Sequence, residues 1–242
     1  MKIPRLRKKG FINRPHSLST FKLASSTHLY TVLTVTGFFL VFGVGLTHGL
    51  TALYVRSIGI PTAITGLIVS GYYIIRIFLE FPIGVLADRA GRRTPIIFSF
   101  LLTGLGALTT TLVYDPILLF LSRSVFGIGV AMFFVASTAL ITDIYVSKRR
   151  GLAIGFLQSL EFIGMLVGAS VGGFFAEALG YMYTFTACSA LLFVSMLIAA
   201  TAPPLRFYAK SFKARRTIDK EYSFKGVGDR NLILIYFTAL LF

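Results

Sequence analysis

The chain contains little cysteine and few charged residues, and both shortages restrict the class of protein to which it can belong. Cys188 is the single cysteine among 242 residues, which excludes a disulfide within one chain and a four-cysteine metal site. It lies in an apolar run, where a small core residue is expected. Only 14% of the residues are charged and 55% are hydrophobic, whereas soluble domains carry about 25% charged residues. The composition is therefore that of a membrane protein.

Several enzyme motifs are missing as well. The sequence contains no glycine-rich nucleotide-binding loop, no cluster with metal-ligand spacing and no nucleophile–base spacing. We therefore expect neither an enzyme nor an ATP-driven pump, and we expect no cofactor or metal.

Acidic residues are scarce, and the basic residues are unevenly distributed. Nine Asp and Glu against 24 Lys and Arg give a formal net charge of +15. All but three of these cations fall in four segments that alternate with apolar runs: 1–28, 84–95, 148–150 and 205–230. Basic residues confined to alternate loops indicate the cytoplasmic side of a membrane, where they meet anionic headgroups. We predict a plasma-membrane protein with a cytoplasmic N-terminus, and the lipid bilayer rather than nucleic acid as its partner.

Six apolar runs are each long enough to cross the hydrocarbon core, which takes about 20 helical residues. They cover approximately residues 29–55, 62–86, 95–114, 117–145, 152–178 and 183–202. The sequence therefore predicts an all-α, polytopic membrane protein with a six-helix bundle at 29–202.

Less apolar segments flank the predicted bundle. Two prolines and the Ser/Thr-rich stretch 17–27 argue against a stable helix in 1–28, which we interpret as a basic cytoplasmic tail. Residues 203–230 are interpreted as a basic cytoplasmic loop, and 231–242 as the start of a seventh transmembrane helix that stops about halfway across the bilayer. We expect a truncated chain, with a natural half-protein as the alternative.

A short charged turn connects the second and third predicted spans. Gly84 could let a neighbouring helix approach, Asp88 can accept hydrogen bonds, and Gly91 permits a tight reversal. The arginines can bind carboxylates, and Asp143 at the inner end of the fourth span is placed to join them. The proposed gate residues are Gly84, Asp88, Arg89, Gly91, Arg92, Arg93 and Asp143. The alternatives are a positive-inside turn with no moving part and, for Asp143, an ordinary helix-end charge.

The sequence from Gly84 to Arg93 resembles the loop signature of the major facilitator superfamily, in the family's position between spans two and three. The resemblance implies one six-helix half of a transporter, in which this loop latches two halves together on the inner side. Arg123 lies in a segment similar to the family's fourth-span Arg-x-x-Gln-Gly-x-Gly pattern, with Phe126 in place of the Gln. The resemblance links Arg123 to proton coupling and the substrate cavity, and an arginine at membrane depth should face a cavity or a carboxylate. A structural arginine is the alternative.

The fifth span carries a glycine pattern. It resembles the family's antiporter signature at every glycine, with Ala169 replacing the proline. The glycines are Gly155, Gly164, Gly168, Gly172 and Gly173. The resemblance implies a face that packs against the other half and is associated with exporters. Close packing between neighbouring spans is the alternative.

Polar residues inside the spans are candidates for proton coupling or the substrate cavity. Glu161 falls on the helix face of Gly168 and Gly172, so it should face the interior, where burial favours the neutral carboxyl. Gln158 could hydrogen-bond to it, and His48 is a second possible proton site. A hydrogen-bonded packing role is the alternative for both Glu161 and His48. Arg76 and Glu80, four residues apart, are interpreted as a structural ion pair.

The sequence thus predicts a proton-coupled exporter of a small molecule, similar to drug/proton antiporters and driven by a proton gradient. Its partners would be the small-molecule substrate and a missing C-terminal half, from the same or a second chain. The alternatives are a sugar or organic-ion symporter or uniporter on the same scaffold, and a non-transporting fragment.

Overall fold

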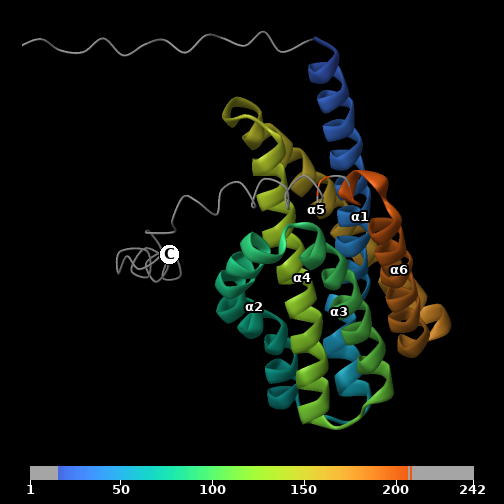
Figure 1. Cartoon of the computed structure of the whole chain (residues 1–242). Helices are drawn as coiled ribbons and strands as arrows, with labels where there is room; N and C mark the ends of the chain where they lie inside the picture. Colours follow the sequence, from blue (N-terminus) through green and yellow to red (C-terminus); the bar gives the residue numbers. More distant parts are fainter. Residues whose placement is uncertain (1–15, 207, 209–242) are drawn as a thin grey trace, which may run out of the picture.

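Six long helices, joined by short turns, form one bundle in the computed structural model (Figure 1). The structure describes the backbone of residues 16–206 and 208, and the side chains of that range from residue 27 onward, except 207. The helices are α1 (His16–Ser57), α2 (Thr62–Ala90), α3 (Arg93–Leu112), α4 (Pro116–Ile144), α5 (Ser147–Leu179) and α6 (Tyr181–Thr201). The described part of the chain contains no strand, and the all-α prediction is confirmed.

The helix ends follow the sequence signals closely, except at α1. This helix begins at His16, so the prediction that residues 17–27 are not helical is wrong. Pro15 is compatible with a helix start, and Ser and Thr hydroxyls inside a helix can bond to preceding carbonyls, as Thr31 does to Thr27. The predicted seventh helix at 231–242 and nearly all of the predicted loop at 203–230 lie outside the described residues.

Two turns show why the chain reverses where it does. Asp115 accepts hydrogen bonds from the backbone N–H groups of Ile117 and Leu118, at 2.9 and 3.1 Å, and so caps α4, with Pro116 at the first helical position. Gly91, between α2 and α3, has a φ of 85°, a left-handed conformation that favours glycine. The predicted role of Gly91 in a tight reversal is confirmed.

Packing places α4 near the centre of the bundle. α3 and α2 both pack against α4, while α1 packs against α5 and α6. Buried rings of α3 and α4 fill the middle of the core, with Phe100 and Phe133 in edge-to-face contact at 5.6 Å between ring centroids. Cys188 of α6 is fully buried and its thiol donates to the Gly43 carbonyl at 3.2 Å, as expected of a core cysteine. In contrast, α2 and α5 leave many apolar side chains exposed.

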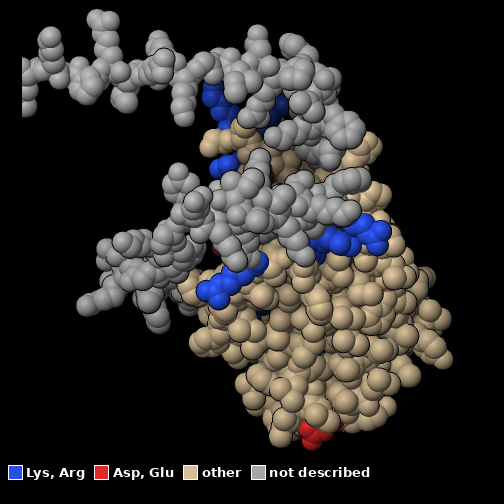
Figure 2. Space-filling view, in the orientation of Figure 1, with Lys and Arg blue, Asp and Glu red and all other residues tan. Residues whose placement is uncertain are grey.

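Successive helices run antiparallel, so alternate loops lie at the same end of the bundle. The basic loops therefore gather at one end. One end, called the basic end here, carries most of the described cations; Figure 2 shows Lys and Arg gathering toward it. These are Arg89, Arg92, Arg93, Lys148, Arg149, Arg150 and Arg206. Each of the six helices is long and apolar enough to cross a membrane. Because α1 has 42 residues, about 63 Å of helix, it projects past the other helices at the basic end (Figure 1).

Candidate functional site

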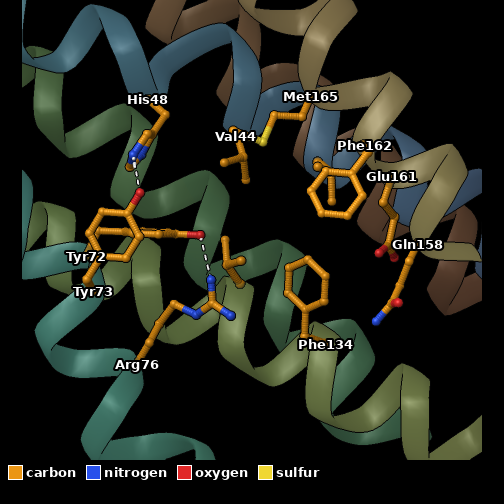
Figure 3. A pocket seen from close by; sticks show the side chains of 12 residues that line it. Val44, His48, Tyr72, Tyr73, Arg76, Phe134, Gln158, Glu161, Phe162 and Met165 are labelled. Carbon is orange, nitrogen blue, oxygen red and sulfur yellow. Dashed lines mark hydrogen bonds between the residues drawn. The ribbon is translucent and has the colours of Figure 1, made fainter. Parts of the chain in front are cut away.

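A cavity of about 370 Å³ lies between α1, α2, α4 and α5 (Figure 3). It is lined by Val41, Val44, His48, Tyr72, Tyr73, Arg76, Val130, Phe134, Gln158, Glu161, Phe162 and Met165. Three of the four predicted cavity candidates, His48, Gln158 and Glu161, are therefore brought together although they come from two different helices. A space of this size with a mostly apolar lining and a few polar groups suits a small organic molecule.

Glu161 occupies the α5 wall and is almost completely buried. The residue is only 3% exposed, and its Oε1 atom has no hydrogen-bond partner among the described residues. Oε1 lies against α1 at Gly37, 3.1 Å from where a Cβ atom at that glycine would be. The predicted interior orientation of Glu161 is confirmed. A buried carboxylate without a partner is costly, so a proton or a cationic ligand would stabilise this group.

His48 occupies the α1 wall and is hydrogen-bonded. Its Nε2 atom lies 2.9 Å from the Tyr73 hydroxyl, and its ring contacts the Tyr72 ring edge-on with centroids 5.0 Å apart. The Nδ1 atom is buried and has no partner in the described residues. His48 is thus fixed at the cavity wall by two tyrosines of α2.

Arg76 lines the cavity from α2, which sequence reasoning missed. The predicted ion pair with Glu80 is present, with Nη2 and Nε at 2.9 and 3.2 Å from the same carboxylate oxygen. Nη1 donates to the Tyr72 hydroxyl at 3.0 Å, and the guanidinium lies over the rings of Tyr72 and Phe134 at 5.4 and 5.3 Å. The i, i+4 spacing of Tyr72, Arg76 and Glu80 was a signal that these three share one helix face.

Arg123, the fourth candidate, is not among the residues that line this cavity. It is 1% exposed, and its guanidinium lies over the Phe126 ring, with Cζ 4.4 Å from the ring centroid. Its Nε and Nη1 atoms have no hydrogen-bond partner among the described residues. Phe126, which replaces the family's Gln, therefore supplies an aromatic face where a polar partner was expected.

The basic end carries a second constellation of predicted site residues. Arg92 donates to both Asp88 and Asp143, the latter with Nε and Oδ2 3.1 Å apart. Tyr208, just after α6, donates to the same Oδ2 atom at 2.6 Å. Burial alone would lower the pKa of Arg92, but the hydrogen bonds and negative charges of Asp88 and Asp143 raise it. The cluster joins α2, the start of α3, the end of α4 and the segment after α6.

The remaining gate candidates divide into three cases. Arg93 donates to the Ala200 carbonyl of α6 at 2.9 Å, and Arg89 is exposed at the surface. Gly84 does not serve a close helix approach among the described residues, because a Cβ there would meet only Val135 of them, at an ordinary 3.9 Å. That prediction for Gly84 is corrected.

The glycine face of α5 packs within this bundle. A side chain at Gly164, Gly168 or Gly172 would collide with the backbone carbonyls of α1 residues Phe38, Phe42 and Leu46. The expectation that these three glycines pack against another half is therefore wrong: α1 covers them, because its backbone approaches α5 too closely for a Cβ. Gly155 and Gly173 have no close neighbour in the part of the chain that the structure describes, since a Cβ atom at either position would have no heavy atom of another described segment within 4 Å. Their contact with another half remains a prediction.

Comparisons with known proteins agree on one family. Residues 32–242 match the family described as the Major Facilitator Superfamily. The chain is 27% identical over 140 residues to the quinolone resistance protein NorA of Staphylococcus aureus, covering 57% of this chain and 36% of that protein. It is 27% identical over 177 residues to multidrug resistance protein 1 of Bacillus subtilis, covering 73% of this chain and 46% of that protein.

The fold agrees with a solved structure as well. The chain superimposes on the proton:xylose symporter XylE bound to 6-bromo-6-deoxy-D-glucose with a TM-score of 0.63 and 18% identity. The match covers 80% of this chain and 49% of that one. The chain spans less than half the length of each of these relatives.

Proposed function

Because the chain belongs to the Major Facilitator Superfamily and is a multi-pass membrane protein, we propose that it forms a six-helix half of a proton-coupled exporter of small molecules. Export is supported by the names of the two relatives, which are both resistance proteins. The cavity between α1, α2, α4 and α5 is the substrate site in this proposal. Two such halves would rock about the cavity and expose it to either side of the membrane in turn.

The observation that supports proton coupling is the burial of Glu161 without a full set of hydrogen-bond partners. Glu161 lines the cavity, is only 3% exposed, and has one buried carboxylate oxygen without a hydrogen-bond partner among the described residues. Gln158 on the same helix, His48 on α1 and Arg76 on α2 are the other polar or charged groups that face the cavity, besides the tyrosines. In an antiporter, the proton and the substrate would occupy Glu161 in turn, because either one relieves the cost of the buried charge.

The cluster of Arg92, Asp88 and Asp143 is the proposed gate. We assign the basic end to the cytoplasm because Lys and Arg of short loops accumulate on that side. The Arg92 side chain is 11% exposed, but the carboxylates of Asp88 and Asp143 are 67% and 34% exposed, and ion pairs that water can reach contribute only about 0–1 kcal/mol. Such a cluster can be broken and remade in every transport cycle at little cost.

Vesicle transport with matched carboxylate variants tests the proposal. The full-length product of the reading frame that holds this chain is reconstituted, and ethidium transport is driven by a pH gradient. Glu161→Gln should abolish the effect of the pH gradient on ethidium transport and should also weaken ethidium binding, because the cation and the proton share this carboxylate. Glu177→Gln, an exposed carboxylate on the same helix, is the control and should behave like the unmodified protein.

Two outcomes would contradict parts of this proposal. Gradient-driven transport that survives in Glu161→Gln would exclude Glu161 as the proton site. If a proton gradient drives ethidium accumulation on the side opposite to that of an exporter, the protein is a symporter on the same scaffold.

A further inference from the structure

The two walls of the cavity offer opposite kinds of binding group. Figure 3 shows Arg76 on the α2 side and Glu161 with Gln158 on the α5 side, with the cavity between them. The rings of Phe134 and Phe162 line the space along with the two tyrosines. From this arrangement we propose that the cavity selects an elongated aromatic zwitterion, whose anionic end binds at Arg76 and whose ammonium end binds at Glu161. The inference rests on the proposed function and names its class of cargo.

Arg76 is prepared to receive an anionic group. Its bonds to Glu80 and Tyr72 use three of the five guanidinium N–H donors, so two remain. The rings of Tyr72 and Phe134 hold the guanidinium in place, and its side chain is 24% exposed. A fixed guanidinium with free donors suits a carboxylate, which accepts hydrogen bonds from two N–H groups at once.

The surrounding charges favour an anion at this end as well. Arg123 is a fully buried cation that lies over the Phe126 ring, whose centroid is 6.1 Å from that of Tyr72, and no described carboxylate pairs with Arg123. Glu80 balances only one of these two cations, and it does not line the cavity. A cargo that carried positive charge alone would therefore meet an uncompensated positive field on the α2 side.

The α5 end favours the opposite charge. Glu161 lines this end of the cavity, and the neighbouring Gln158 side chain can accept a hydrogen bond from an ammonium as well. Exchange with a proton requires that cargo and proton compete for the same carboxylate. An ammonium competes with the proton, whereas a purely anionic cargo would bind better after Glu161 is protonated, which is the wrong sign for exchange.

Size and lining fit a two-ring aromatic body. The cavity volume of about 370 Å³ is at the lower end of the range for drug-sized ligand sites, roughly 300–1,000 Å³. Phe134, Phe162 and Met165 offer apolar contact along the cavity, between the two charged ends. An aromatic spacer between the two charges would pack against these side chains.

Three probes with one aromatic body separate the charge requirements. They are 6-(aminomethyl)-2-naphthoic acid, which is a zwitterion, its methyl ester, which is a cation, and its N-acetyl derivative, which is an anion. Binding to the purified full-length protein in lipid nanodiscs is measured by naphthalene fluorescence at about pH 8. We expect the zwitterion to bind at least about tenfold more tightly than either other form, since each charge-assisted contact is lost in one of them.

Variants assign the two ends. Arg76→Gln should abolish the advantage of the zwitterion over the ester, while Arg76→Lys, which keeps the charge, should retain part of it. Glu161→Gln should weaken the zwitterion and the ester but not the anion. Arg56→Gln removes an exposed cation at the far end of α1 and should change none of the three affinities.

Binding at equilibrium needs no proton gradient, so the result is independent of the transport test. If the ester binds the unmodified protein as tightly as the zwitterion does, the inference is overturned, whatever the variants show. If the preference is present but no proton gradient drives transport, the assignment of the two ends stands and the proposed exchange fails.

Discussion

The guanidinium of Arg92 and the carboxylate of Asp143 form an ion pair at 3.1 Å between the start of α3 and the end of α4. The same guanidinium also binds Asp88, at the end of α2, so one cation joins three helices. The sequence placed Asp143 near the arginines of the loop without distinguishing among them. The structure selects Arg92, because it lies at the N-cap of α3 and faces both carboxylates.

A double-mutant cycle measures how strongly this pair couples. Arg92→Gln, Asp143→Asn and the double variant should give a coupling free energy of about 1 kcal/mol or less, because Asp143 is one-third exposed. The measurement is the free energy of unfolding in mixed micelles. Arg149→Gln, an exposed basic-end cation, is the control and should show no coupling with Asp143→Asn. A coupling above about 3 kcal/mol would indicate a permanent brace rather than a gate.

Tyr208 should make stability sensitive to alkaline pH. Burial raises the pKa of Tyr208, and the hydrogen bond to Asp143 and its negative charge raise it further, despite the opposing effect of Arg92. A raised pKa in the folded state means that the folded protein holds this proton more tightly. The contribution is therefore fully present below the unfolded pKa of 10.0 and is lost as the pH rises above it.

The variant Tyr208→Phe isolates this contribution. Between about pH 9 and about pH 11, the melting temperature of Tyr208→Phe should fall less steeply than that of the unmodified protein. Tyr183→Phe, at an exposed position on α6, is the matched control and should leave the slope unchanged. Equal slopes for Tyr208→Phe and the unmodified protein would contradict the assignment.

Two glycines of α5 should respond oppositely to the same substitution. Gly168→Ala places a Cβ against the Phe42 carbonyl of α1, so the helices must separate and the protein should lose about 1–3 kcal/mol. Gly173→Ala meets nothing within 4 Å and should be neutral or stabilising by up to about 1 kcal/mol, since alanine favours the helix. Thermal unfolding of the purified protein compares them. Equal destabilisation by both would mean that α1 does not cover the glycine face.

Arg123 should be a residue whose removal stabilises the fold. Its guanidinium is buried, and Nε and Nη1 have no hydrogen-bond partner among the described residues, so Arg123→Met should raise the free energy of unfolding, by roughly 2–3 kcal/mol if the full cost of a buried arginine is recovered. Leu119→Met, one turn earlier on α4 and fully buried, is the control and should cost under about 1.5 kcal/mol. If gradient-driven ethidium transport falls while stability rises, Arg123 has a functional role. A destabilised Arg123→Met protein would instead show that the arginine is structural.

Local sequence signals predicted the helices, the chain reversals between them and the helix faces of several side chains. Pro116 after Asp115 and Gly91 after a charged helix end mark chain reversals by chemistry that needs no tertiary context. The 100° periodicity of a helix sufficed to place Glu161 on the buried face, and i, i+4 spacing sufficed for the Arg76–Glu80 pair.

What could not be predicted depends on which helices are neighbours. Tyr72, Tyr73 and Arg76 belong to the cavity only because α2 lies across from α5, which no local pattern encodes. The partner of the glycine face was misassigned for the same reason. The spacing shows that the glycines share one helix face, but it does not show that α1 packs against that face. Tyr208 reaches Asp143 across 65 residues of sequence, beyond any periodicity.

The contact between α1 and α5 has a consequence for how the protein is made. Gly168 meets Phe42 through backbone atoms, yet about 125 residues separate them. At about 5–20 residues per second, the ribosome needs roughly 6–25 seconds to deliver α5 after α1 has emerged. During that interval the α1 surface at Gly45, where the backbone of Met165 and Ala169 packs in the finished bundle, has no helix to cover it. Biogenesis of the bundle therefore includes a waiting period, in which lipid or the insertion machinery must shield α1 until its fifth-helix partner arrives.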